Sequence, residues 1–101
     1  MYQLFLDILK ENQNLIISKG IVIKNTIPLI VQDKQYGITV EFSYSNKIGI
    51  FSVKTTTTNY STYDIEIIDT DTCCLTFISS DNLDNEKLLL PLLINFIGRL
   101  S

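Results

Sequence analysis

The sequence predicts an α+β domain of two layers: an N-terminal helix, an antiparallel sheet of about five strands and a C-terminal helix. Three observations support this fold class. Apolar residues recur at helical spacing at both ends of the chain, polar and apolar residues alternate strictly in the middle, and short polar segments separate the alternating runs. With 101 residues the chain has the usual length of one domain, so we expect a single unit, 1–101.

The first segment is typical of an amphipathic helix. Its apolar residues fall on one stripe, which only Asn12 interrupts: Leu4, Phe5, Ile8, Leu9, Leu15 and Ile16. Lys19 and Gly20 then form a helix stop, because a cation suits the last turn and glycine the position after it. We therefore expect one long helix; the alternative ends the helix near Asn14 and makes Leu15–Ile23 a hairpin.

The middle of the chain is expected to form an antiparallel meander. Its clearest strand is Gly37–Tyr44, where apolar and polar residues alternate, so that one face is buried and the other wet. The other predicted strands are one edge strand that Pro28 interrupts and three further runs: Ile21–Lys24 with Leu29–Gln32, Ile48–Thr55, Tyr63–Ile68 and Cys73–Ile78.

Alternation also predicts which strand residues face the core and where the chain turns. The predicted core positions are Ile38, Val40, Phe42, Tyr44, Phe51, Val53, Tyr63, Ile65 and Ile67. Turns are expected at Asp33–Gly37, Ser45–Lys47 and Asp69–Asp71, with a loop at Ser79–Asn82. Thr55–Thr62 is either a strand extension or a loop, because its threonines favour extended backbone.

The last segment predicts a strongly apolar helix. Ser80 or Asp81 can cap its N-terminus, Asp84 and Glu86 suit the positive end of its dipole, and Pro91 is expected to bend it. Apolar residues then cover well over half of its circumference, which is more than one sheet buries. We expect the excess to be shared with a second copy in a homodimer, with an interface formed by Leu90, Ile94 and Ile97; the alternative is that the sheet wraps around the helix.

The composition argues against most catalytic chemistry. The sequence contains no histidine and a single arginine, Arg99. Without histidine, Ser-His and Cys-His pairs and most zinc sites are excluded, and one arginine leaves little capacity to clamp phosphates. We therefore expect a protein that is not an enzyme and that uses no cofactor or metal. The alternative is a small enzyme that uses a cysteine or carboxylates such as Asp64 and Glu66.

The two cysteines and the apolar runs bear on location. Cys73 and Cys74 are adjacent, and a disulfide between neighbours is strained, so we expect two reduced thiols, with a redox pair as the alternative. The longest apolar run, Leu88–Ile94, is too short to span a bilayer, and no secretory signal is visible. We expect a cytoplasmic protein that does not bind membranes.

Charge is distributed unevenly along the chain. The net charge of −3 disfavours nucleic acid as a partner, since nucleic acid requires a basic face. No lysine or arginine occurs from Thr55 through Glu86, and a partner protein with a basic patch would be attracted to this region. The predicted partner-binding residues are Tyr60 as an anchor with Asp64, Glu66, Asp69 and Asp71. The alternative is that these carboxylates only keep the surface solvated.

The order of the predicted elements, together with particular stretches of sequence, carries a family resemblance. A helix precedes a three-strand meander that includes Leu29–Thr55, and a hairpin and helix cover Tyr63–Leu100, where Asp81–Leu89 leads into Asn95-Phe96. In this pattern the chain resembles the small acidic chaperones of type III secretion. The resemblance implies a cytosolic homodimer that binds an unfolded segment of a secreted effector along its sheet and a helix-lined groove. The chain departs from that family at Thr55–Thr62, which stands where a helix commonly forms the dimer interface.

The function predicted first is therefore a non-catalytic module that binds and masks another protein, as a secretion-type chaperone does. The alternative is an immunity protein or phage-type inhibitor that blocks a folded toxin or defence protein, since many of these are equally small, acidic and α+β. A chaperone would bind an extended segment on apolar surface, whereas an immunity protein would set its acidic face against a basic site.

Overall fold

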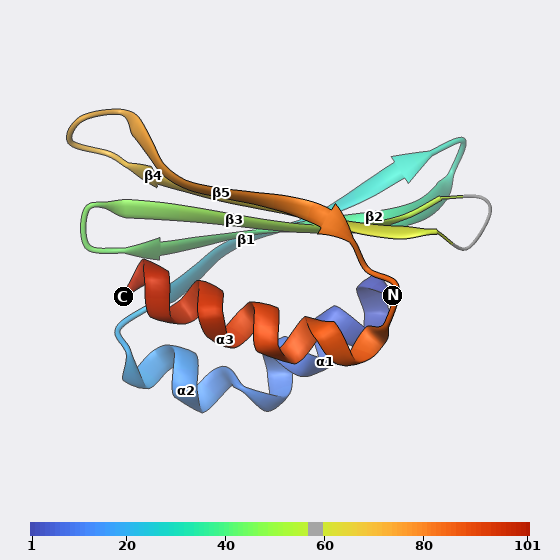
Figure 1. Cartoon of the computed structure of the whole chain (residues 1–101), viewed down its shortest axis with the longest axis horizontal. Helices are drawn as coiled ribbons and strands as arrows, with labels where there is room; N and C mark the ends of the chain where they lie inside the picture. Colours follow the sequence, from blue (N-terminus) through green and yellow to red (C-terminus); the bar gives the residue numbers. More distant parts are fainter. Residues whose placement is uncertain (57–59) are drawn as a thin grey trace.

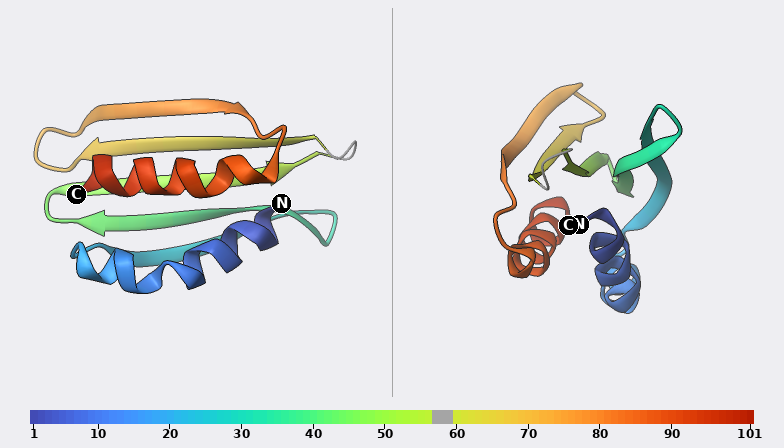
Figure 2. Two further views of the ribbon diagram at one scale, coloured as in Figure 1. Left: turned by 60° about the horizontal axis from the view of Figure 1, so that its bottom comes forward. Right: turned by 90° about the vertical axis from the view of Figure 1, so that its right-hand side faces the viewer.

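The computed structural model describes residues 1–56 and 60–101, which form a two-layer α+β fold (Figure 1). Its elements are, in chain order, α1 (Tyr2–Glu11), α2 (Gln13–Ser18), β1 (Val22–Val31), β2 (Lys34–Tyr44), β3 (Lys47–Thr55), β4 (Ser61–Asp69), β5 (Cys74–Asn82), the short 3₁₀ helix η1 (Glu86–Leu88) and α3 (Leu89–Leu100). The strands lie in the order β1-β2-β3-β4-β5, each antiparallel to the next. The helices cover one face of this sheet (Figure 2). The predicted fold class is confirmed.

The N-terminal segment forms two helices, so the prediction of one long helix is wrong. The break lies at Asn12, whose backbone has φ −104° and ψ 14° and whose Nδ2 donates a hydrogen bond to the Ile8 carbonyl at 2.8 Å. A side chain that occupies backbone acceptors in this way weakens a helix. The predicted stop is confirmed, because Gly20 follows α2 with φ 79° in a Schellman motif. The alternative hairpin at Leu15–Ile23 is wrong.

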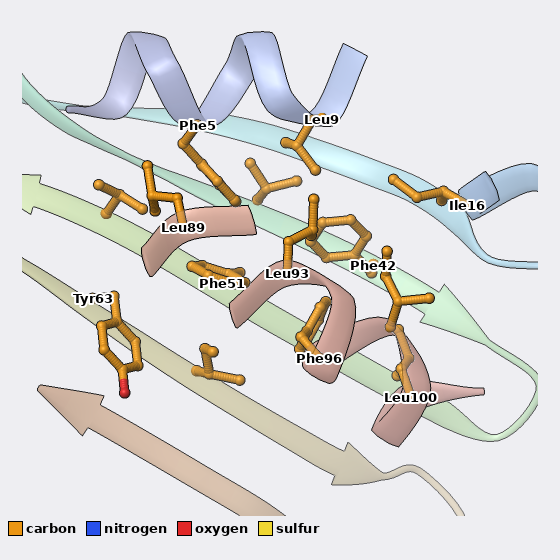
Figure 3. Close-up of a cluster of buried hydrophobic side chains, with 14 of the residues drawn as sticks. Phe5, Leu9, Ile16, Phe42, Phe51, Tyr63, Leu89, Leu93, Phe96 and Leu100 are labelled. Atoms are coloured by element: carbon orange, nitrogen blue, oxygen red, sulfur yellow. The ribbon is translucent and has the colours of Figure 1, made fainter. Parts of the chain in front are cut away.

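The core lies between the helices and the inner face of the sheet, and phenylalanine rings fill its centre (Figure 3). The ring of Phe51 on β3 stacks on Phe5 of α1 with centroids 4.6 Å apart, and it meets Phe96 of α3 edge to face at 5.5 Å. The predicted alternation is confirmed. Tyr44 is half-buried, and the other predicted core positions are buried: Ile38, Val40, Phe42, Phe51, Val53, Tyr63, Ile65 and Ile67.

The turn between β1 and β2 is shorter than predicted. It consists of Gln32 and Asp33, which both have positive φ (51° and 63°), as a type I′ hairpin requires. The predicted turn at Asp33–Gly37 is therefore wrong. Gly37 lies inside β2, where a Cβ would stand 2.5 Å from the Val53 carbonyl oxygen, so this glycine permits close strand packing. The turns after Tyr44 and Asp69 occur where they are predicted.

Both edge strands are longer and more continuous than predicted. The edge position of β1 is confirmed, but Pro28 does not interrupt it, because β1 is one strand from Val22 to Val31. At the other edge, β5 extends to Asn82 and pairs with β4 over its whole length, so the predicted loop at Ser79–Asn82 is wrong. Cys73 lies in the preceding turn with φ 57° and not in a strand. Within the predicted strand extension or loop at Thr55–Thr62, residues 57–59 lie outside the described residues.

The C-terminal helix begins later than predicted. Asn85 caps η1, because its Oδ1 accepts a hydrogen bond from the Lys87 N–H at 2.9 Å, and α3 follows from Leu89. The predicted caps Ser80 and Asp81 belong to β5. Pro91 is the third residue of α3, within the first turn, where a missing N–H costs little, so the predicted bend in the helix is wrong. Among the described residues, no helix has the length and apolarity that a membrane crossing requires.

Candidate functional site

The face of the sheet opposite the helices, called the open face below, carries the candidate site. Figure 2 shows that the helices lie on the other side of all five strands. Along β2, β3 and β4, residues on the open face alternate with buried core residues, and the pairing of all five strands places the open-face residues in rows. Two neighbouring rows cross the whole sheet: Asn25, Glu41, Ile50, Glu66 and Ile78, and then Ile27, Thr39, Ser52, Asp64 and Ser80.

Hydrogen bonds across the strands fix the polar side chains of these rows. Ser80 Oγ donates to Asp64 Oδ1 at 2.6 Å, and Lys54 Nζ lies 3.5 Å from Asp64 Oδ2. In the neighbouring row, Asn25 Nδ2 donates to Glu41 Oε2 at 3.1 Å. Because cross-strand partners hold Asp64 and Glu41, these two carboxylates have defined positions before any partner arrives.

A shallow cleft of about 330 Å³ lies in the middle of the open face, lined by Ile50, Ser52, Lys54, Asp64 and Glu66. Among the described open-face residues of β2–β5, three carboxylates (Glu41, Asp64 and Glu66) stand against one cation, Lys54. Apolar side chains separate these charges; Ile78 is 59% exposed and Ile27 on β1 is 48% exposed. The open face therefore combines apolar contact area with an excess of negative charge.

The predicted partner-binding residues do not form one surface. Asp64 and Glu66 lie on the open face, as their spacing on one strand implied. Asp69 and Asp71 lie at one end of β4, in the turn to β5, where both accept hydrogen bonds from Asn46 Nδ2 at 3.3 and 3.2 Å. These two carboxylates stabilise the contact between neighbouring turns.

Tyr60 lies at the opposite end of β4, and its hydroxyl donates a hydrogen bond to Asn82 of β5. Tyr60 precedes the nine residues of β4 and therefore lies about 30 Å from Asp69, since an extended strand rises about 3.3 Å per residue. Tyr60 is therefore not an anchor within the open-face rows. Sequence reasoning missed Glu41, which is distant in sequence and reaches Glu66 only through the pairing of β2, β3 and β4.

The predicted dimer interface is divided between the surface and the core. Ile97 is buried in the core of one copy, so its assignment to the interface is wrong. Leu90 and Ile94 are 44% and 43% exposed on the helical side of the molecule. Leu90 lines a groove of about 330 Å³ between α1 and the start of α3, together with Leu4, Ile8, Glu11, Glu86 and Lys87. Because the groove carries charges of both signs, a second copy related by a two-fold axis can pair acidic with basic groups there.

Replacing Leu90 or Ile94 by lysine tests this predicted dimer. Each charge would lie in the apolar contact, so we expect Leu90→Lys and Ile94→Lys to give monomers, measured by light scattering after size-exclusion chromatography. Ile17→Lys, on the exposed side of α2, is the matched control and should leave the dimer intact. A monomeric unmodified protein at micromolar concentration would contradict the prediction.

The remaining reactive groups form no further site in the described part of the chain. Cys73 and Cys74 are both exposed free thiols. No group of metal-ligating side chains is present among residues 1–56 and 60–101. Comparison with protein-family models, curated proteins and solved structures finds no match for this chain.

Proposed function

We propose that this chain is a non-catalytic binding module that masks a basic amphipathic helix of a partner protein on the open face of its sheet. The observation that supports the proposal is the pattern of the two rows. In the first row Glu41 and Glu66 alternate with Ile50 and the exposed Ile78, and the second row carries Asp64 and the exposed Ile27. Within residues 1–56 and 60–101, no second layer covers this face of the sheet (Figure 2).

A helix is the occupant that this surface fits best. The central strands β2, β3 and β4 are hydrogen-bonded to a neighbouring strand on both sides, so their backbone groups are already paired. On the open face of these strands a partner can therefore contact only side chains. A helix laid on a sheet buries one apolar stripe, as the chain's own helices do on the opposite face. Lysines or arginines beside that stripe would meet Glu41, Asp64 and Glu66, whereas an acidic helix would be repelled.

A secretion-type chaperone masks a segment of another protein, which is why we place the module in that class. On the open face this segment would be helical and not extended as the sequence suggested, because the paired strands offer no free backbone groups there. The second candidate is an immunity protein or inhibitor that covers a basic site on a folded partner. The fixed position of Asp64, held by Ser80 and Lys54, favours this second candidate, because preorganised charges suit a rigid target. A chaperone would bind the excised segment as tightly as the whole partner, whereas an inhibitor would require the folded partner.

Charge reversal on the open face tests the proposal. The probe is a synthetic amphipathic peptide of leucine and lysine, titrated against isotope-labelled protein by NMR. We expect chemical-shift changes at the residues of the two open-face rows. We also expect Glu41→Lys combined with Glu66→Lys to weaken peptide binding about tenfold, which corresponds to about 1.4 kcal/mol. The reason is that two attractive contacts become repulsive.

The matched control is Glu11→Lys combined with Glu86→Lys, which changes the net charge equally but lies on the helical side. This control should bind the peptide as the unmodified protein does. If both pairs of substitutions weaken binding equally, only the net charge matters. If the chemical-shift changes are confined to the groove between α1 and α3, the peptide binds there and not on the open face. Either result would overturn the proposal.

A further inference from the structure

The two edges of the sheet carry opposite charges, because basic and acidic residues are concentrated in different parts of the sequence. Because the strands lie in sequence order, β1 forms one edge and β5 the other. At the β1 edge, the exposed Lys24 lies on the strand, Lys19 precedes it, and Lys34 follows the turn at the start of β2; one aspartate, Asp33, accompanies them. Along the β5 edge the balance is reversed: the exposed carboxylates of Asp71, Asp81 and Asp84 accompany one cation, Arg99, which stacks on the Phe77 ring at 4.2 Å.

Both edges also expose apolar side chains. On β1 nine of the ten residues are exposed, and the large apolar ones among them are Val22, Ile23, Ile27, Ile30 and Val31. On β5 Leu75 and Ile78 are 50% and 59% exposed. An edge strand has backbone groups on its outer side with no strand to pair with, and a long apolar edge is a site for pairing with another extended chain. Pro28 and the bulge at Lys24 limit this pairing at β1 without covering the strand.

We propose that β1 of one copy pairs with β5 of a second copy, so that the sheet continues from one molecule to the next. The charges select this combination. Two β1 edges would bring lysines together and two β5 edges would bring aspartates together, whereas β1 against β5 sets Lys24 and Lys34 near Asp71 and Asp81. Such a contact joins unlike surfaces, so it is head-to-tail and can add further copies. It leaves the open face free and is independent of the proposed function.

The strand directions give this pairing a defined geometry. Each strand is antiparallel to the next, so β1 and β5 run in the same direction within one molecule. Copies related by translation therefore pair in parallel, with their open faces on the same side, and Cys74 at the start of β5 lies near Val22 at the start of β1. If the second copy is turned over, the pairing is antiparallel, and Cys74 lies near Val31 instead. In both arrangements, lysines of one edge meet aspartates of the other.

Two charge-reversed variants test the contact. The first is Lys24→Glu with Lys34→Glu on the β1 edge, and the second is Asp71→Lys with Asp81→Lys on the β5 edge. By sedimentation velocity at about 0.01 M salt, where the Debye length is about 30 Å, we expect the unmodified protein to sediment at more than about twice the monomer mass. At about 1 M salt, where the Debye length is about 3 Å, the edge contact should be lost, which leaves at most the dimer formed through the helices. Each variant alone should not exceed the mass of that dimer, but a mixture of the two should, because their altered edges are complementary.

The control is Lys10→Glu with Lys87→Glu, which has the net charge of the first variant but lies on the helices. At about 0.01 M salt it should associate as the unmodified protein does. Leu90→Lys should also associate there through the sheet edges, although it lacks the dimer contact on the helices, and this distinguishes the two contacts. In a Cys73→Ser background, Val22→Cys or Val31→Cys should form an intermolecular disulfide with Cys74. Absence of association at low salt, failure of the mixture to restore it, or no disulfide from either added cysteine would each overturn the proposal.

Discussion

Replacing Phe51 by alanine is expected to remove a large part of the stability of this protein. Phe51 is fully buried at the centre of the core, where it contacts a helix from each end of the chain through Phe5 and Phe96 (Figure 3). Truncating a buried phenylalanine costs about 3–5 kcal/mol, because the apolar contacts are lost and a cavity remains. A domain of this size has a free energy of unfolding of about 5–15 kcal/mol, so the substitution removes a large part of it.

Urea unfolding followed by circular dichroism measures this effect. Leu75→Ala is the control, because the side chain is half exposed on β5 and its removal should change the free energy of unfolding by less than about 1 kcal/mol. A similarly small change for Phe51→Ala would show that the three aromatic rings do not meet as described.

Gly49→Ala is expected to have the second largest effect. A Cβ at this position would lie 2.5 Å from Phe96 Cζ and 3.3 Å from Leu100 Cδ1. The Phe96 ring cannot move away freely, because it packs against Phe42 at 4.9 Å as well as against Phe51. Overpacking of this kind costs about 1–3 kcal/mol. The glycine is thus required for α3 to approach β3 closely.

The chain offers a matched control in Gly98, on the exposed side of α3. A Cβ there would meet no atom within 4 Å, so Gly98→Ala adds a methyl group without a clash. We expect this substitution to stabilise the helix by about 0.5–1 kcal/mol, because alanine loses less backbone entropy than glycine. The two variants should therefore shift the urea midpoint in opposite directions. A destabilised Gly98→Ala together with an unaffected Gly49→Ala would contradict the packing of α3 on the sheet.

The fold could be predicted from the sequence because its signals are local. Alternation along single strands identified the inner face of the sheet, and helical spacing identified the stripes of α1 and α3. Errors arose where a side chain acts on the backbone in an unusual way. Asn12 divides a helix by bonding to the Ile8 carbonyl, and Gln32 and Asp33 form a tight turn with positive φ although neither is glycine.

The candidate site was less predictable because it depends on the pairing of strands. The spacing of Asp64 and Glu66 places both on one face of β4, and this much is visible in the sequence. Glu41 joins them only through the registers of β2, β3 and β4, which the sequence does not specify. Conversely, Asp69 and Asp71 look like part of the same acidic region, but the turn directs them toward Asn46.

The meeting of Phe5 and Phe96 on Phe51 also constrains how the protein folds during synthesis. The hairpins join neighbouring strands, so they can form early, as local contacts generally do. The inner face of the sheet nevertheless lacks half of its cover until the 12 residues of α3 have left the ribosome. Until then Phe42 and Phe51 remain partly uncovered, in addition to the two sheet edges, which are exposed in the folded protein as well. A ribosome stalled before α3 should therefore display a nascent chain that binds general chaperones, and addition of the last helix should release it.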